Sequence, residues 1–148
     1  MLNMKTRILG LMALIITSLS FTACDDDDDA NSLLVGKWQQ THVIDEESYD
    51  LDETFEDCEW EEKTNARVEF TSDGIMKGWE LENGTWEFAG GMPYKYSDGK
   101  ITIPEMEGSA TVVKLTDNEL VLHEGGIERY QGQSRPIKWI VKSKFRRI

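Results

Sequence analysis

From Ala66 onward, apolar and polar residues alternate along much of the chain with a period of two. This pattern predicts short β-strands, because successive side chains of a strand point to opposite faces of its sheet. Turn sequences recur between the alternating runs, at Ser72-Asp73-Gly74, Glu82-Asn83-Gly84, Ser97-Asp98-Gly99 and Thr116-Asp117-Asn118. Asn-Gly and Asp-Gly favour tight hairpins, so we expect consecutive strands to be antiparallel neighbours.

Together with an earlier apolar segment at Leu33–Ile44, the pattern predicts an all-β fold of about eight antiparallel strands. A meander of this length can stack as a sandwich or close as an up-and-down barrel, and the even hairpin spacing favours the barrel. The last alternating segment, Ile137–Phe145, carries lysines on its other face. We expect this segment to pair with the first strand and close the barrel.

An acidic segment follows the first strand, because residues 45–62 contain no lysine or arginine. Leu51, Phe55 and Cys58 have spacings of four and three, which fit a short helix, and a long loop is the alternative. Four oxygen-bearing residues also have the spacing of a calcium loop: Asp50, Asp52, Thr54 and Glu61. The position that needs glycine in such a loop is Phe55, so we expect a solvated acidic face and no metal site.

Near the start of the chain, the basic residues Lys5 and Arg7 precede an uncharged apolar run from Ile8 to Phe21. The run is shorter than the roughly 20 residues that span a bilayer core, and it is typical of a secretory signal peptide. We therefore expect residues 1–23 to be removed on export. The junction Phe21-Thr22-Ala23-Cys24 resembles the bacterial lipobox, with phenylalanine where leucine is usual. This resemblance implies a lipoprotein whose Cys24 carries diacylglycerol and a further acyl chain such as palmitate.

Residues 24–32 then form a lipidated acidic tether, which we expect to be disordered because it has nothing apolar to bury. The five aspartates after Cys24 resemble a signal that sends Gram-negative lipoproteins to the cell surface. We expect a lipid-anchored protein of the outer membrane, on the cell surface, with the periplasmic face as the alternative. The lipid anchor is the expected contact with the membrane.

Charge argues against nucleic acid as a partner. The whole chain has a formal net charge of −12, and removal of Lys5 and Arg7 with the signal peptide leaves −14. Binding to nucleic acid depends on neutralising phosphates with basic side chains, so we expect no nucleic-acid binding. From residue 129 to the end of the chain, basic residues occur without acids. We expect this segment to lie beside the acidic segment and neutralise it; the alternative is that it faces a partner or lipid headgroups.

Enzymatic motifs are not apparent in the sequence. Cys58 has no intramolecular partner if Cys24 is acylated, and neither His42 nor His123 has a recognisable spacing to it. We expect Cys58 to be a small buried apolar residue. The sequence predicts a protein that is not an enzyme, has no cofactor and is a monomer.

A resemblance to lipocalins is carried by several short motifs in order. Leu34-Val35-Gly36-Lys37-Trp38 contains the Gly-x-Trp opening, and three further segments follow: Phe70–Gly74, Gly84–Phe88 and Leu115–Leu122. This series of motifs is similar to the lipocalin-like domain of small lipoproteins from Gram-negative gut anaerobes. The resemblance covers Leu33 to His123. It implies a lipocalin-like β-barrel domain at residues 33–148. It also implies a structural role for Trp38, packed against Lys144, Arg146 or Arg147.

The remaining aromatic residues are candidates for a binding site inside the barrel. We expect them to point inward or to sit near its rim: Trp79, Trp86, Phe88, Tyr94, Tyr96 and Trp139. The leading hypothesis is a membrane-anchored, non-enzymatic protein that binds a small apolar ligand in the barrel. The alternative is a surface accessory or adhesion module that binds a protein or glycan through its outer face, for which an exposed apolar or aromatic patch is expected.

Overall fold

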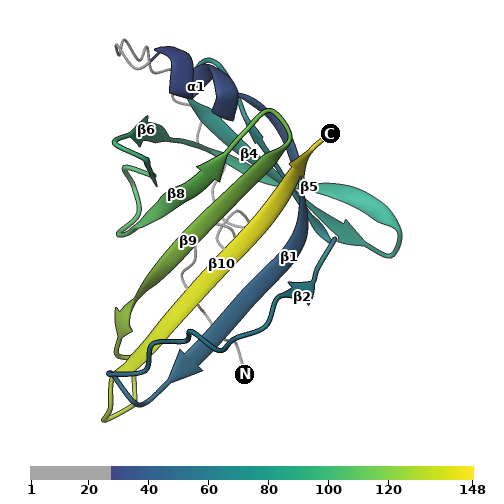
Figure 1. The fold of residues 1–148 in the computed structure, drawn as a ribbon. Coiled ribbons are helices and arrows are strands. Elements are labelled where there is room, and N and C mark those ends of the chain that lie inside the picture. The colour runs from purple at the N-terminus through teal and green to yellow at the C-terminus, as the bar shows by residue number, and fades with distance from the viewer. Residues whose placement is uncertain (1–27) are drawn as a thin grey trace.

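The structure, a computed structural model, describes residues 28–148 as one antiparallel sheet with a short helix at one end (Figure 1). The expected signal peptide at 1–23 and Cys24 lie outside the described residues. The helix is α1 (Asp28–Leu34). The strands are β1 (Gly36–Ser48), β2 (Glu61–Glu62), β3 (Ala66–Phe70), β4 (Ile75–Glu82), β5 (Thr85–Pro93), β6 (Lys95–Ser97), β7 (Lys100–Thr102), β8 (Ser109–Leu115), β9 (Glu119–Glu128) and β10 (Ile137–Arg147).

The all-β, up-and-down antiparallel fold expected from the alternating pattern is confirmed. The strand order is β5-β4-β3-β1-β10-β9-β8-β7-β6, and β2 pairs with β1. The first long strand pairs with the last from Trp38 opposite Arg147 to Ser48 opposite Lys138, as the sequence predicted. The sheet has ten strands rather than about eight, since β2, β6 and β7 are short elements of two or three residues.

The sheet differs from a closed barrel in one place. Its order begins with β5 and ends with β6, so among the described residues the sheet is a curled half-barrel, open between two strands that are consecutive in sequence. Pro93 ends β5 and has no N–H group to donate to a ladder. The next residue, Tyr94, donates its backbone N–H to the carbonyl of Gly74. The chain therefore crosses the open side without forming a hairpin there.

Helix α1 covers one end of the half-barrel (Figure 1). It occupies residues that we expected to belong to a disordered tether, so that expectation is wrong from Asp28 onward. Leu34, its last residue, has no exposed surface and belongs to the core, which explains why this end of the segment is ordered. No helix within residues 28–148 is long and apolar enough to cross a membrane.

The concave inner face is filled by its own side chains near α1. Side chains from both halves of the sheet and from the helix meet in one core, whose members include Leu34, Trp38, Val68, Phe70, Met76, Met92, Tyr94, Ile101, Ile103, Leu120, Leu122 and Phe145. Trp38, Phe70 and Phe145 are each at most 1% exposed, as expected for a close-packed core. This part of the barrel interior is therefore a packed core.

Between β1 and β2, residues 49–60 of the acidic segment form a loop rather than a helix. Phe55 has a φ of 57°, which an α-helix does not allow, and it is buried. The Asp50 carboxylate accepts the N–H of Asp52, and the Glu53 carboxylate accepts the N–H of Phe55, so side chains satisfy the backbone locally. Within residues 28–148, no group of three His, Cys, Asp or Glu side chains is arranged to hold a metal ion.

Cys58 is half-buried in this loop, not fully buried as we expected. Partial burial, followed by the charges of Glu46 and Glu53, raises the pKa of its thiol above the usual value. A raised pKa keeps the thiol neutral and lowers its nucleophilicity.

The basic segment lies beside the acidic segment, which confirms the placement that we expected. Lys138 Nζ donates to the backbone carbonyl of Glu53 at 2.6 Å. Lys144 Nζ lies 4.1 Å from the centroid of the Trp60 ring. Strand β10 therefore holds the acidic loop against the outer face of the sheet.

Candidate binding groove

The Gly-x-Trp motif forms the closed end of the half-barrel. Trp38 has no exposed surface, and its Nε1–H donates to the carbonyl of Leu34 at 2.9 Å. The guanidinium of Arg147 lies 4.2 Å from the centroid of the Trp38 ring. The expected basic partner is therefore Arg147, rather than Lys144 or Arg146. This cation–π contact, made beside a buried ring, packs Trp38 into the closed end of the half-barrel.

Arg147 also connects three elements by hydrogen bonds. Its Nη1 donates to the carbonyl of Val35 at 3.0 Å, and its Nε donates to the carbonyl of Asp117 in the β8–β9 turn. Gly36 allows this arrangement, because a Cβ there would lie 2.2 Å from Nη1 of Arg147 and its φ is 143°. The glycine of the motif is thus required by backbone conformation and by space.

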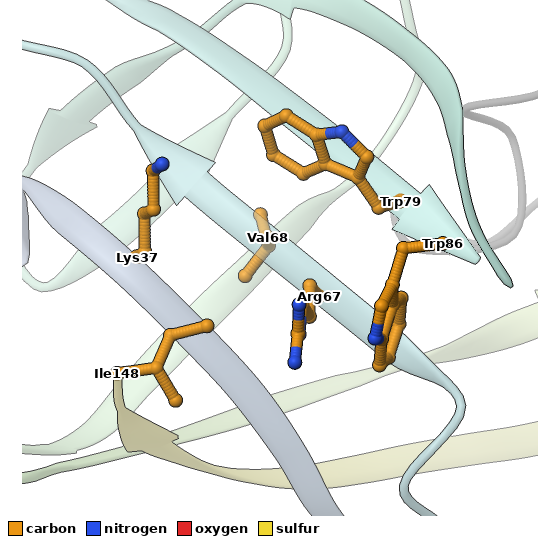
Figure 2. A pocket seen from close by; sticks show the side chains of 6 residues that line it. All are labelled: Lys37, Arg67, Val68, Trp79, Trp86 and Ile148. Carbon is orange, nitrogen blue, oxygen red and sulfur yellow. The ribbon is translucent and has the colours of Figure 1, made fainter. Parts of the chain in front are cut away.

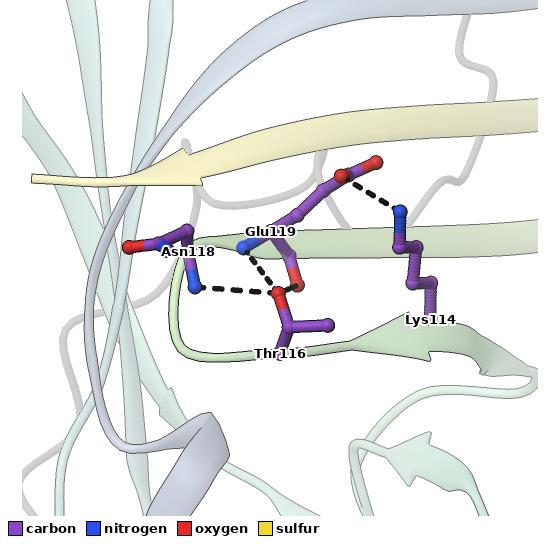
Figure 3. A network of polar contacts seen from close by, with 4 residues as sticks. All are labelled: Lys114, Thr116, Asn118 and Glu119. Carbon is purple, nitrogen blue, oxygen red and sulfur yellow. Dashed lines mark hydrogen bonds and ion pairs between the residues drawn. The ribbon is translucent and has the colours of Figure 1, made fainter.

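The β8–β9 turn is shaped for this contact by Thr116 (Figure 3). Its hydroxyl oxygen accepts the backbone N–H of Asn118 at 3.3 Å and that of Glu119 at 3.0 Å. Lys114 and Glu119 form an exposed ion pair at 2.9 Å across the same hairpin. The side chain of Thr116 therefore fixes the turn whose Asp117 carbonyl receives Arg147.

Tyr94 and Tyr96 lie with the core on the inner face, as expected. The Tyr94 ring packs edge-on against Phe70 with centroids 5.1 Å apart, and its hydroxyl donates to the carbonyl of Thr71 at 3.1 Å. Burial, with a smaller effect from Asp73, raises the pKa of Tyr94 to about 12. Tyr96 is partly buried against the same cluster. Tyr94 is thus a core residue with a satisfied hydroxyl rather than a residue open to a ligand.

Trp139 lies on the inner face too, but near the other end of β10. It is two residues from Val141 and six from the core residue Phe145, along a strand without a bulge. Its ring lies over Gly126 on β9, where a Cβ would be 3.4 Å from the indole Nε1. Trp139 is therefore separated from the filled end of the half-barrel.

Trp79, Trp86 and Phe88 are on the outer face, so the expected inward position is wrong for these three. Trp79 lies there because it alternates with the buried Gly78 in β4. For Trp86 and Phe88, the cause is a β-bulge in β5. Gly78 is opposite Gly90, but the next residue, Trp79, is opposite Phe88, which leaves Ala89 as an extra residue. An extra residue reverses the side on which the following side chains lie. Met92 therefore points into the core, while Phe88 is 59% exposed on the other face.

The strand register places these aromatic residues beside cationic ones. One row crosses the outer face of five strands, in the order Arg146, Gln39, Arg67, Trp79, Phe88. Directly opposite residues in such a ladder have Cβ atoms roughly 5 Å apart. Trp79 and Phe88 accordingly have ring centroids 5.6 Å apart. One half of the row is basic and polar, and the other half is aromatic.

A groove of about 240 Å³ lies on this face, lined by Lys37, Arg67, Val68, Trp79, Trp86 and Ile148. Figure 2 shows Lys37 and Ile148 toward one end, Trp86 with Arg67 against it toward the other, and Trp79 along one side. The groove therefore combines flat aromatic surface with two cationic side chains from neighbouring strands.

The guanidinium of Arg67 is held by two contacts. Its Nε–H donates to Oε1 of Gln39 at 2.8 Å, and its Cζ lies 3.9 Å from the centroid of the Trp86 ring. Gln39 is itself buried, and its amide donates to the carbonyls of Thr64 and Ala66. Within residues 28–148, no hydrogen bond from the Nη groups of Arg67 is present. These groups therefore have hydrogen-bonding capacity for a ligand in the groove.

The sequence did not identify Arg67 and Lys37 as candidates, although one signal was available. In β4, Ile75, Trp79 and Leu81 share one alternating face with Lys77, whose charge is unusual for a buried face. The buried residues of this strand are Met76 and Gly78 instead. Lys77 therefore marked the solvent-facing side, on which Trp79 also lies. Glu69 is opposite Lys77 in the strand register and is also opposite Lys37, so these three side chains are on the same face.

These features define an antiparallel half-barrel closed at one end by a Gly-x-Trp motif and its arginine. The family model described as "lipocalin-like domain" matches residues 34–122. The chain belongs to the lipocalin-like family, whose barrel fold is compatible with ligand binding. No curated protein matches the chain.

Proposed function

We propose that this chain is a membrane-anchored, non-enzymatic lipocalin-like protein that binds a saccharide in the outer-face groove. The observation that carries the proposal is the placement of Trp79 and Arg67 side by side in the groove, while the inner face near α1 is filled. This proposal takes up the surface-binding alternative of the sequence analysis, for which an exposed aromatic patch was expected. That patch is supported by Leu81 and Phe88, which are 37% and 59% exposed next to the groove.

The chemistry of the groove favours a saccharide over an apolar chain. A saccharide ring has an apolar face that can stack on tryptophan and a polar rim that can bond to charged groups. An apolar chain would leave Lys37 and Arg67 desolvated without partners, which costs free energy. The groove volume of about 240 Å³ is below the usual range of small-molecule sites, roughly 300–1,000 Å³. We therefore expect one or two rings to be bound.

A second candidate function is the binding of a small apolar ligand inside the half-barrel, as the sequence first suggested. The observation that favours it is the half-buried Trp139 on the inner face, away from the filled core. The two candidates predict different tryptophan responses: Trp139 would respond to a ligand in the interior, and Trp79 to a ligand in the groove.

The anchor completes the proposal. Acylation of Cys24 would place the domain on the outer membrane, with the cell surface favoured by the aspartates at 25–29. Labelled palmitate should be incorporated into the chain in growing cells and not into the Cys24→Ala variant. Incorporation into that variant would contradict the anchor. Replacement of the five aspartates by alanine should reduce the cleavage of the protein by protease added to whole cells. Unchanged cleavage would exclude a sorting role.

A glycan array with the purified full-length chain in detergent tests the groove. We expect glycan binding that is lost in Trp79→Ala. It should be retained in Trp60→Ala, the matched control, because Trp60 lies beside Lys144 of β10 and does not line the groove. A parallel fluorescence titration with fatty acids, bile acids and haem tests the interior. Saturable binding of one of these that is lost in Trp139→Ala and retained in Trp79→Ala would overturn the groove and support the second candidate.

A further inference from the structure

The cations of the groove are unusual in a chain that is strongly acidic. The formal net charge is −12, yet the outer face of β10, β1, β3 and β4 carries a local excess of positive charge. Around the groove, the ladder register places Arg146, Lys37, Arg67 and Lys77 on this face, with Glu69 among them. A positive site attracts an anionic ligand that has come close to it, although the net charge of the whole protein is negative. The same site repels cationic ligands at short range.

Arg67 is built to receive a planar anion. Stacking on Trp86 at 3.9 Å fixes the plane of the guanidinium, and the bond to Gln39 fixes its rotation within that plane. A fixed guanidinium recognises a carboxylate through two parallel N–H···O bonds, and little side-chain entropy is lost on binding. Trp86 is thus a positioning residue for Arg67, since the guanidinium covers one face of its ring.

Trp79 is the stacking surface that remains. It is directly opposite Arg67 in the ladder, so a ring lying on Trp79 would bring a substituent on its edge to the guanidinium. Lys37 is exposed at the other end of the groove and forms no ion pair within residues 28–148. The groove therefore presents an aromatic surface between two cationic groups.

We propose that the groove binds an acidic saccharide, with a uronate ring on Trp79, its carboxylate on Arg67, and a second acidic group near Lys37. This inference rests on the proposed function and specifies its ligand class. It adds the requirement that the charge on the sugar, and not only its ring, is recognised.

The test compares trigalacturonic acid with its methyl ester, which keeps the ring and removes the charge. Calorimetry with the full-length chain in detergent should show that the acid binds at least about tenfold more tightly than the ester. The ratio of the two affinities should decrease in Lys37→Gln and in Arg67→Gln. In the double variant, the acid and the ester should bind equally. Lys144→Gln, which removes a cation elsewhere on the outer face, should leave the preference unchanged. Arg67→Lys should restore only part of the preference, because it keeps the charge and loses the fork.

The outcomes separate this inference from the proposed function. Equal binding of acid and ester, lost in Trp79→Ala, would overturn the acidic ligand and support the saccharide groove. Tight binding of the acid that none of the groove variants weakens would overturn both. Failure of the acid to bind at millimolar concentration would overturn the inference, and the glycan array would then decide the proposed function alone. Trp86→Phe should retain the acid preference and Trp86→Ala should reduce it, which a merely structural role of Trp86 would not produce.

Discussion

Two regions of this molecule pair an arginine with a tryptophan, and the pairs have opposite surroundings. At the closed end, Arg147 lies 4.2 Å from a Trp38 ring that has no exposed surface, and its N–H groups bond to backbone carbonyls of three segments. On the outer face, Arg67 lies 3.9 Å from Trp86, both are half-buried, and within residues 28–148 the guanidinium has one hydrogen bond, to Gln39. Among the same residues, Arg147 donates from Nε, Nη1 and Nη2, whereas Arg67 donates from Nε alone.

The difference teaches that hydrogen-bond satisfaction, and not ring contact, separates the structural pair from the pair that we propose to bind a ligand. Both arginines are half-buried, so burial of the arginine itself does not separate the two pairs. Arg147 directs its donors to backbone carbonyls, whereas the Nη groups of Arg67 are left to water, which a ligand can later replace. Substitutions at the two pairs should therefore affect different measurements.

The largest effect is expected for Trp38→Ala compared with Trp79→Ala. Removal of the buried Trp38 ring should lower the free energy of unfolding by about 3–5 kcal/mol, because it leaves a cavity and removes the ring beside the Arg147 guanidinium. Removal of the half-buried Trp79 should cost less than about 1 kcal/mol. Urea unfolding followed by circular dichroism measures both. Equal losses would show that the outer-face aromatic residues belong to the core and would weaken the binding proposal.

Gly36→Ala should have the next largest effect, again at the closed end. A Cβ at this position would lie 2.2 Å from Nη1 of Arg147, and a φ of 143° is strained for any L-residue with a side chain. We expect a loss of about 2–3 kcal/mol in the free energy of unfolding. Gly84→Ala is the control, because its φ is also positive but a Cβ there would meet nothing within 4 Å. If the control costs as much, the contact with Arg147 contributes little, and backbone strain explains the effect.

The closed end could be predicted from the sequence, and the groove could not. The Gly-x-Trp motif and the turns depend on local residue types, and the β1–β10 pairing follows from a meander that must close. The choice of Arg147 over Arg146 required the register, since adjacent strand residues point to opposite faces. Arg146 is accordingly in the outer-face row.

The position of Trp86 and Phe88 depends on one residue that the pattern does not reveal. A regular β5 would place both on the face of Met92, which is in the core. The bulge at Ala89 reverses them, and the two glycines that follow make such an irregularity easier without fixing its position. The helix expected at Leu51–Cys58 fails for a similar reason, since short acidic side chains bond to the backbone and compete with helical hydrogen bonds.

Tyr94 should give a smaller effect that appears at alkaline pH. Its folded-state pKa is about 12, above the usual value near 10, so the unfolded chain loses the phenolic proton first. The folded state then binds more protons, and its stability should fall as the pH rises from 10 to 12. Tyr94→Phe should cost about 1 kcal/mol at pH 7 by removing the bond to Thr71, and it should flatten the alkaline decline. Tyr49→Phe, at a 50% exposed residue, should leave the decline unchanged. An unchanged decline in Tyr94→Phe would contradict the raised pKa.

The smallest effect is expected where a cation and a ring meet on the outer face without any ligand role. Lys144 lies 4.1 Å from the centroid of Trp60 and helps to hold the acidic loop on the sheet. Lys144→Gln should lower the free energy of unfolding by about 0.5–1 kcal/mol, which is the range for cation–π contacts near the surface. Lys114→Gln, which breaks the exposed ion pair with Glu119, should cost still less.

Hydrogen exchange of the loop amides in Lys144→Gln measures the local part of this effect. Faster exchange confined to residues 49–60 would show that the contact fastens the loop and leaves the sheet intact. Faster exchange across β1 and β10 as well would place Lys144 with the structural pair at Trp38. Binding of trigalacturonic acid should not change in this variant, because its cation lies outside the groove lining. A change in binding would mean that any cation on the outer face contributes and that Arg67 is not distinct.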